Sequence, residues 1–372
     1  MRVLVCGGGT GGHIYPALSV VDSLRRDGLA ADDFLWIGTR DQMEERLVPR
    51  EGLRLETIPG GPIVGMAPEK MMINAAQLTW SLGTVNRLLG RFRPHVLFLT
   101  GGYVNVPVSI VARVRRVPAA IFLPDVEPGT AIEVLKHLVD RIACTTAASA
   151  PYLPEDKMVV TGYPVRPELR RATTLLREEA LATFHLTTKR PTLLVFGGSR
   201  GARSINRALM AVLPALLAED IQVIHVSGQL DWEEVEANAA TLPADSRSRY
   251  RPYPYLHGEM GAAMRAADLA VTRAGAGMLG EAPAFALPSI LVPYPHAWRY
   301  QKINADYLAE RGAAVRLDDE QLGERLLPTV LSLLQDAERL AAMSAAAHAL
   351  DVPDAADNVA RLLLDLKRER RD

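Results

Sequence analysis

The chain has 372 residues, 48% of them apolar and 23% charged, and a formal net charge of -1. This length exceeds one ordinary core, so we expect two domains of roughly 150 to 200 residues. The near-neutral charge gives no electrostatic basis for a nucleic-acid partner. No stretch reaches the roughly 18 apolar residues that span a bilayer, and the first residues lack the apolar core of a signal peptide. We therefore expect a cytoplasmic protein that is not integral to a membrane.

The two cysteines, Cys6 and Cys144, lie far apart, each within an apolar run. This placement favours buried thiols over a disulfide, as is usual in a reducing cytoplasm. The sequence also holds no His or Cys cluster with metal-ligand spacing and no Asp-x-Asp motif. We therefore expect no bound metal and no cofactor.

Short apolar runs alternate with longer amphipathic segments through the first half of the chain. Runs of this kind, rich in Val, Ile, Leu and Phe, are typical of buried parallel strands. They span residues 2–6, 34–38, 95–102, 119–124, 141–145 and 158–162. A helix is predicted over 16–28, because a proline stands early in it and Gly28 can end it.

The same alternation starts again in the second half of the chain. Residues 191–216 predict a strand, a glycine turn and a helix, and further strands are predicted over 222–228, 268–275 and 288–294. The link between the two α/β units is expected near 163–169, where two prolines bracket a short polar stretch. Such sheets bind ligands beyond the carboxyl ends of their strands. Two sheets facing each other across a cleft would form the GT-B architecture, which glycosyltransferases share with some other two-domain α/β enzymes.

The opening glycine turn fits two kinds of site. Gly7, Gly9 and Gly12 satisfy the G-x-G-x-x-G pattern of dinucleotide-binding proteins, and Asp32 follows about 20 residues later. That acid should end the second strand, where it could reach a ribose, but here it precedes the strand predicted over 34–38. The match is weak, and an NAD-dependent dehydrogenase remains an alternative interpretation.

His13 stands where this turn becomes a helix. The positive pole of a helix disfavours the imidazolium, so it helps to keep the ring neutral. A neutral imidazole with a pKa near the working pH is suited to act as a general base. The alternative is a structural histidine that is bonded to a backbone carbonyl.

Six ordered blocks extend from this turn over nearly the whole chain, and together they resemble the MurG family. They are GGGTGGHIYPALSV (7–20), LTGGYVNVP (99–107), TGYPVR (161–166), GGSRGARSIN (197–206), the long block from Thr272 to Ala305, and RGAAVRL (311–317). This family transfers N-acetylglucosamine from its UDP donor to a lipid-linked muramyl-pentapeptide.

The resemblance implies an overall organisation and a place in the cell. The fold would be α/β with GT-B architecture, two Rossmann-like domains facing across a cleft. Residues 1–163 would form the acceptor and membrane-side domain, 164–345 the UDP-sugar domain, and 346–372 a helical segment that packs back on the first. The enzyme would be inverting and metal-independent, with helix N-termini and arginines stabilising the leaving group. It would make lipid II for peptidoglycan synthesis on the cytoplasmic face of the cell membrane.

The resemblance also implies the residues that bind the UDP-sugar. Backbone N–H groups of the second glycine turn would hold the diphosphate, as helix N-termini commonly do, although a tight turn without ligand is the alternative. Glu281 would accept both ribose hydroxyls, or it is an ordinary first-turn acid of a helix. Tyr300 replaces the first glutamine of a family pair that contacts the sugar. The full donor set is Arg166, Ser199, Gly201, Leu256, His257, Glu281, Tyr300 and Gln301.

On the acceptor side, the chain matches the family in one region and departs from it in another. Thr10, Gly11, Gly12, His13 and Tyr103 match positions that would face the acceptor, with His13 as catalytic base. The stretch FLPDVEPG (122–129) stands where relatives read close to HEQNAVPG, so Phe122 and Leu123 replace a His-Glu pair. Asp125 replaces an asparagine and could share or take over the base role.

This departure keeps alternative functions open. A related GT-B glycosyltransferase could act on a different lipid acceptor, and a UDP-sugar-binding regulator without turnover is a further possibility. For the membrane, residues 67–93 carry large apolar side chains beside basic ones, a combination that suits anionic headgroups. The alternative is a helix that packs on the first sheet. The residues concerned are Lys70, Met71, Met72, Leu78, Trp80, Leu82, Arg87, Arg91 and Arg93.

Overall fold

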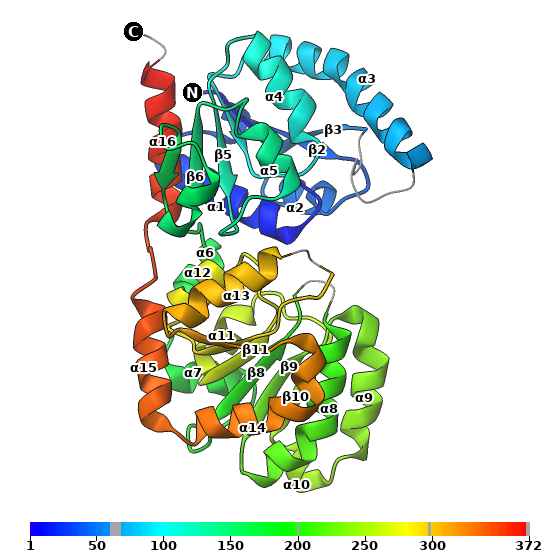
Figure 1. The fold of residues 1–372 in the computed structure, drawn as a ribbon, viewed down its shortest axis with the longest axis vertical. Coiled ribbons are helices and arrows are strands. Elements are labelled where there is room, and N and C mark those ends of the chain that lie inside the picture. The colour runs from blue at the N-terminus through cyan, green and yellow to red at the C-terminus, as the bar shows by residue number, and fades with distance from the viewer. Residues whose placement is uncertain (60–67, 199–200, 297–298, 370–372) are drawn as a thin grey trace. The chain divides into compact units, whose positions relative to one another are not determined.

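The computed structural model describes residues 1–59, 68–198, 201–296 and 299–369, and the chain divides into two compact units (Figure 1). The first unit comprises Met1–Arg166 together with Asp354–Asp372. The second comprises Pro167–Pro353. The chain therefore returns to its first unit at the C-terminus.

A seven-stranded sheet forms the centre of the first unit, in the order β3-β2-β1-β4-β5-β6-β7 with every neighbouring pair parallel. Its strands are β1 (Val3–Cys6), β2 (Phe34–Thr39), β3 (Arg54–Ile58), β4 (Val96–Leu99), β5 (Ala119–Leu123), β6 (Arg141–Cys144) and β7 (Met158–Val160). The residues of β1, β4 and β5 are all buried, as expected of central parallel strands.

Helices connect these strands. They are α1 (Gly11–Arg26), α2 (Glu44–Arg50), α3 (Pro68–Phe92), α4 (Asn105–Val114), α5 (Thr130–Leu135) and, from the chain's end, α16 (Ala355–Glu369), with short 3-10 turns at Ala31–Asp33 and Ala147–Tyr152. Helix α16 packs on α1 (Figure 1). Asp357 of α16 accepts hydrogen bonds from Ser23 at 2.5 Å and from Arg26 at 2.7 Å. These contacts attach the C-terminal helix to the first unit.

The second unit repeats the plan with a six-stranded parallel sheet in the order β10-β9-β8-β11-β12-β13. The strands are β8 (Thr192–Phe196), β9 (Gln222–Val226), β10 (Tyr250–Tyr253), β11 (Leu269–Thr272), β12 (Ser289–Leu291) and β13 (Ala314–Arg316). The helices are α6 (Pro167–Ala172), α7 (Arg177–Thr183), α8 (Arg203–Ala218), α9 (Trp232–Thr241), α10 (Ala244–Arg247), α11 (Met260–Ala266), α12 (Met278–Ala284), α13 (Tyr300–Glu310), α14 (Leu322–Leu334) and α15 (Ala337–His348), with 3-10 turns at Gln229–Asp231 and Asp319–Gln321.

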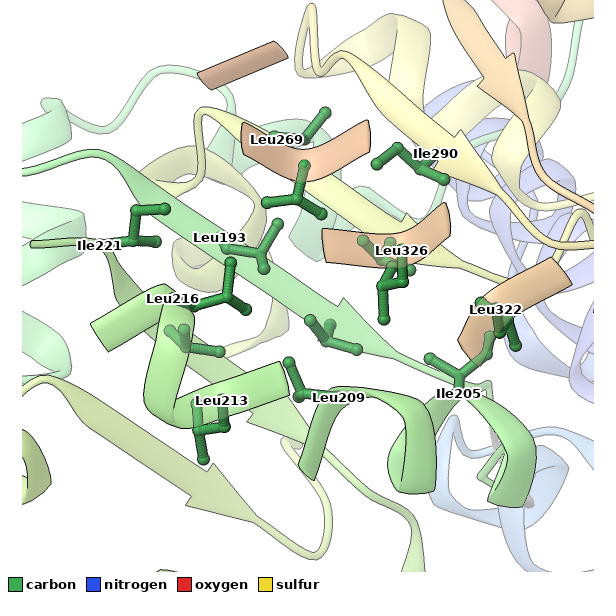
Figure 2. Close-up of a cluster of buried hydrophobic side chains, with 14 of the residues drawn as sticks. Leu193, Ile205, Leu209, Leu213, Leu216, Ile221, Leu269, Ile290, Leu322 and Leu326 are labelled. Carbon is green, nitrogen blue, oxygen red and sulfur yellow. The ribbon is translucent and has the colours of Figure 1, made fainter. Parts of the chain in front are cut away.

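Helix α8 packs its apolar face on this second sheet (Figure 2). Ile205 and Leu209 from α8 belong to one buried cluster with Leu193 of β8 and with Leu322 and Leu326 of α14. Apolar side chains that are removed from water in this way supply most of the driving force for folding. The cluster fixes α8 against β8, and so it fixes the glycine turn between them.

Both cysteines are free and buried, which confirms the prediction of buried thiols. Burial raises the pKa of Cys6 well above its ordinary value, with the nearby Glu44 carboxylate adding to the shift. Burial likewise raises the pKa of Cys144 to about 12. Neither thiol is therefore a thiolate at neutral pH. Among the described residues, no helix is long and apolar enough to cross a bilayer.

A buried carboxylate supports the glycine turn that follows β1. Glu44, in the first turn of α2, has none of its surface exposed. Its two oxygens accept hydrogen bonds from the backbone N–H groups of Gly9 at 3.0 Å and Thr39 at 2.8 Å. A Cβ atom added at Gly8 would lie 1.9 Å from one of these oxygens, so any other residue there would displace the carboxylate. The carboxylate thus joins the ends of β1 and β2.

We predict that Glu44→Gln lowers the free energy of unfolding by about 1 to 3 kcal/mol, because an amide offers one acceptor oxygen where the carboxylate offers two and one buried N–H loses its partner. Urea unfolding followed by circular dichroism would measure the change. The control is Glu45→Gln, since Glu45 is exposed and its substitution should leave stability nearly unchanged. Equal effects of the two substitutions would contradict the role assigned to Glu44.

Candidate active site

The sheet order of the first unit brings three predicted site residues to one edge. Strands β1, β4 and β5 are neighbours, so the turns that follow them lie side by side at the carboxyl ends of the strands. These turns lead to His13, Tyr103 and Asp125 respectively. Contact between the first two turns is close, because a Cβ atom added at Gly101 would lie 2.9 Å from His13 Nε2.

His13 occupies the third position of α1 and is half-buried. Its Nδ1 atom lies 3.1 Å from the carbonyl oxygen of Gly8 and 3.4 Å from the hydroxyl of Thr10. A carbonyl oxygen can only accept a hydrogen bond, so Nδ1 carries the proton in the neutral ring. Nε2 is then the atom with a free lone pair. The bond to a backbone carbonyl that the structural alternative predicted is thus present, and it is compatible with Nε2 accepting a proton.

Glu44 was not expected from the sequence, yet it supports this arrangement. It holds Gly9 directly and lies against Gly8, whose carbonyl orients His13. An acid in the first turn of a helix is ordinarily a solvated residue that favours the helix dipole. The stretch DQMEERL therefore carried no local signal that one of its two glutamates is fully buried.

The loop after β5 presents acids where its strand presents only apolar side chains. Phe122 and Leu123 end β5 and are completely buried, so neither offers a functional group at the edge of the sheet. Asp125 is half-buried, and Glu127 is 7% exposed. Glu127 is a further residue that the sequence analysis missed, because an acid in a loop next to proline and glycine is usually solvated.

Arg166 lies close to the first turn of α1. Its guanidinium carbon is 4.5 Å from the ring centroid of Tyr15, two residues beyond His13. Stacking of this kind orients an arginine without neutralising its charge. Thr10 is exposed at the start of the same helix, and Gly11, Gly12 and Tyr103 are partly exposed. The structure thus gathers the predicted acceptor-side residues and Arg166 in the first unit.

In the second unit, the turn after β8 leads into the 16-residue helix α8. Gly198 and Gly201 have positive φ angles of 82° and 76°, and the Gly201 N–H donates to the Gly198 carbonyl at 3.0 Å. Gly201 therefore shapes the turn, and its own N–H is already bonded. The N–H groups in the first turn of a helix lack intrahelical partners and favour anions. Ser199, a predicted diphosphate contact, lies outside the described residues.

The other predicted donor residues lie near the ends of neighbouring strands in the second unit. Glu281 is in α12, which follows β11, and is partly exposed. Tyr300 begins α13, and the side-chain oxygen of Gln301 accepts a hydrogen bond from the Tyr294 N–H at 2.9 Å. Leu256 is 7% exposed.

His257, which was predicted to cover the uracil, lies beside another aromatic residue. The ring of His257 lies 4.7 Å from that of Tyr255, and its backbone N–H donates to Glu259.

Asp32 lies in the 3-10 turn before β2, at the sheet edge opposite the glycine turn. A dinucleotide ribose at that turn would be out of its reach. Within the described part of the chain, no three His, Cys, Asp or Glu residues are grouped to hold a metal ion.

Comparison with known proteins places both units in one family. Residues 3–144 match the glycosyltransferase family 28 N-terminal domain, and residues 192–359 match the C-terminal domain of that family. A Roseiflexus protein is 40% identical over 98% of this chain and 94% of its own length. A Desulforudis audaxviator protein is 38% identical over 96% of each chain. Both are named UDP-N-acetylglucosamine–N-acetylmuramyl-(pentapeptide) pyrophosphoryl-undecaprenol N-acetylglucosamine transferase.

Solved structures agree on the fold. The crystal structure of Acinetobacter baumannii MurG covers 98% of this chain and 100% of its own, with a TM-score of 0.75 and 24% sequence identity. Together with the two parallel sheets, this likeness confirms the predicted α/β fold class with two Rossmann-like domains of GT-B type. The chain belongs to glycosyltransferase family 28 and, within it, to the MurG family of N-acetylglucosamine transferases.

Proposed function

We propose that this chain transfers N-acetylglucosamine from UDP-N-acetylglucosamine to the 4-hydroxyl of a lipid-linked N-acetylmuramyl-pentapeptide, lipid I, and so makes lipid II for peptidoglycan synthesis. Relatives that carry this name match the chain over nearly its full length. The observation that carries the mechanism is the orientation of His13, whose Nδ1 is bonded to Gly8 and whose Nε2 is left to accept a proton.

The reaction that fits this geometry is a single displacement with inversion. His13 Nε2 takes the proton of the acceptor hydroxyl while that oxygen bonds to C1 of the sugar and the bond from C1 to the UDP oxygen breaks. UDP leaves with the electron pair of that bond. The Gly8 carbonyl stabilises the imidazolium that forms, because it accepts the proton on Nδ1. Asp125 and the buried Glu127 lie in the loop after β5, two strands along the sheet from β1, which leads into the helix of His13.

The second unit would bind the UDP-sugar. We assign the diphosphate to the turn at Gly201 and the first turn of α8, with Ser199 included from the sequence. Glu281 would accept the ribose hydroxyls, Leu256 and His257 would cover the uracil, and Tyr300 with Gln301 would face the sugar. The N-terminus of α8 would supply positive charge for the leaving group, so we propose that the reaction needs no metal ion.

We further propose that the protein binds the cytoplasmic face of the cell membrane through α3 and α4. Trp80 is 81% exposed, and Arg87 and Arg91 follow it by seven and eleven residues, which places all three on one face of α3. Val114 of the adjacent α4 is also exposed. Leu82 instead packs against the core. The side chains of Lys70, Met71, Met72 and Leu78 lie outside the described residues.

The decisive test is a transfer assay with radiolabelled UDP-N-acetylglucosamine and a panel of lipid acceptors. We expect label in lipid II only with lipid I, and the same rate in the presence of EDTA. Because FLPDVEPG departs from the family pattern, a preference for another polyprenyl-linked sugar would replace the proposed acceptor. Activity that EDTA abolishes and magnesium restores would refute the metal-independent mechanism, and donor binding without transfer would indicate a regulator.

We predict that His13→Ala lowers turnover by about two to four decades, which is the usual contribution of a general base. Donor affinity should be largely retained, since His13 acts on the acceptor. Steady-state kinetics and calorimetry with UDP would separate the two quantities. Asp125→Asn serves as the companion variant. An active His13→Ala enzyme beside an inactive Asp125→Asn enzyme would transfer the base role to Asp125.

For the membrane, we predict that Trp80→Glu weakens binding to vesicles that contain phosphatidylglycerol by roughly tenfold, because an interfacial aromatic is replaced by a repelled charge. The melting temperature should not change, since the side chain is exposed. Leu230→Glu is the matched control, because Leu230 is 73% exposed in the second unit. Equal vesicle binding by both variants would place the membrane contact elsewhere.

A further inference from the structure

We propose that a buried chain of hydrogen bonds centred on His225 is a positioning device for the diphosphate-binding turn. His225 itself would never touch the ligand. The inference rests on the proposed UDP site at the start of α8. It adds His225, Tyr250 and Asp231, which lie outside the six sequence blocks and have no part in the reaction steps proposed above.

The chain of bonds begins in the middle of the second sheet. His225 in β9 has none of its surface exposed. Its Nδ1 lies 2.7 Å from the hydroxyl of Tyr250 in the neighbouring strand β10, and its Nε2 lies 3.0 Å from Oδ1 of Asn206 in α8. The ring therefore bridges an edge strand and the helix that follows the glycine turn.

Every proton in this chain has a defined place. The Asn206 amide nitrogen donates to the Ser227 carbonyl and to the Asp231 carboxylate, both at 2.9 Å, so its oxygen faces His225. Nε2 must then carry the ring proton, and Nδ1 accepts the hydroxyl proton of Tyr250. Burial lowers the pKa of His225 to about 3, so the ring stays neutral at neutral pH. A histidine with both nitrogens bonded has no acid-base role in the transfer.

The far end of this series of hydrogen bonds holds the first turn of α8. Asp231, 5% exposed, accepts a hydrogen bond at 2.8 Å from Arg203, the first residue of α8. On the other flank of the helix, the Ser204 hydroxyl accepts from Arg273 at 2.7 Å and donates to Asp319 at 2.8 Å. Arg203, Ser204 and Asn206 are thus all fixed by side-chain bonds.

The glycine turn before α8 lies directly against a group that this network holds, the Ser227 carbonyl. A Cβ atom added at Gly201 would lie 2.3 Å from the Ser227 carbonyl oxygen, so the turn rests directly on that residue. This carbonyl is the one that Asn206 bonds. Loss of the bond from Asn206 to Ser227 would leave both the Ser227 carbonyl and the start of α8 less firmly held. Anion binding by backbone N–H groups depends on their being held in place beforehand, since otherwise binding must pay for their ordering.

The experiment compares UDP with uridine, because only UDP carries the diphosphate. Calorimetry on the full chain would measure both affinities for the wild type, His225→Phe and Tyr250→Phe. We expect His225→Phe to weaken UDP by about tenfold and leave uridine unchanged, since a ring of similar size keeps the packing but loses both bonds. Tyr250→Phe should shift the ratio of the two affinities in the same direction by a smaller factor.

Two controls separate positioning from general destabilisation. Glu281→Ala should weaken UDP and uridine by the same factor, because both ligands carry the ribose. Leu333→Ala removes a buried core side chain of α14 and should lower the melting temperature without changing the ratio of affinities. A variant that merely loses stability behaves like Leu333→Ala.

The outcomes distinguish the absence of a donor site from the absence of a positioning role for His225. A wild-type protein that binds neither ligand would remove the proposed donor site itself. A wild type that binds UDP, with His225→Phe at an unchanged ratio of affinities, would overturn the positioning role alone. If His225→Phe does not fold, Tyr250→Phe carries the test, and an unchanged ratio in that variant overturns the proposal.

Discussion

A turn that leaves a buried central strand still needs partners for the backbone N–H and C=O groups that face the protein, and both units meet this requirement with side chains. In the first unit the turn after β1 gives the Gly9 N–H to a buried carboxylate, Glu44. In the second, the turn after β8 rests on Ser227, whose carbonyl is bonded by Asn206. Each glycine turn is therefore held by side chains from elsewhere in its own unit.

The two histidines show how the same side chain serves different ends. His13 is half-buried and uses one nitrogen for the Gly8 carbonyl, which leaves the other nitrogen available for the base role proposed above. His225 is fully buried and uses both nitrogens, which fixes its tautomer and removes it from proton transfer. Burial and the number of bonded nitrogens, rather than the residue type, separate a reactive imidazole from a structural one.

The sequence predicted the central strands well, because parallel strands covered on both faces are uninterrupted apolar runs. It missed β3, β10 and β13, which are all edge strands. Their stretches RLETI, YRPY and AVR carry charged residues or proline, and most of their residues are partly exposed.

The place of His13 at the start of a helix was predictable, because a glycine turn followed by a helix is a local pattern in the sequence. Glu44 and Asp231 were not, because their partners lie 35 and 25 residues away along the chain.

The stretch FLPDVEPG, which departs from the pattern that the resemblance implied, contributes to the packing of the first unit through its first residue. The Phe122 ring packs edge-on against Tyr163, with centroids 5.9 Å apart. Tyr163 belongs to the stretch TGYPVR, whose last residue, Arg166, stacks on Tyr15 of α1. An aromatic residue at position 122 thus helps to hold the segment that presents Arg166. The two acids of this loop, Asp125 and Glu127, follow the buried end of β5, so the loop carries its charge beyond the strand while the strand itself contributes only apolar side chains.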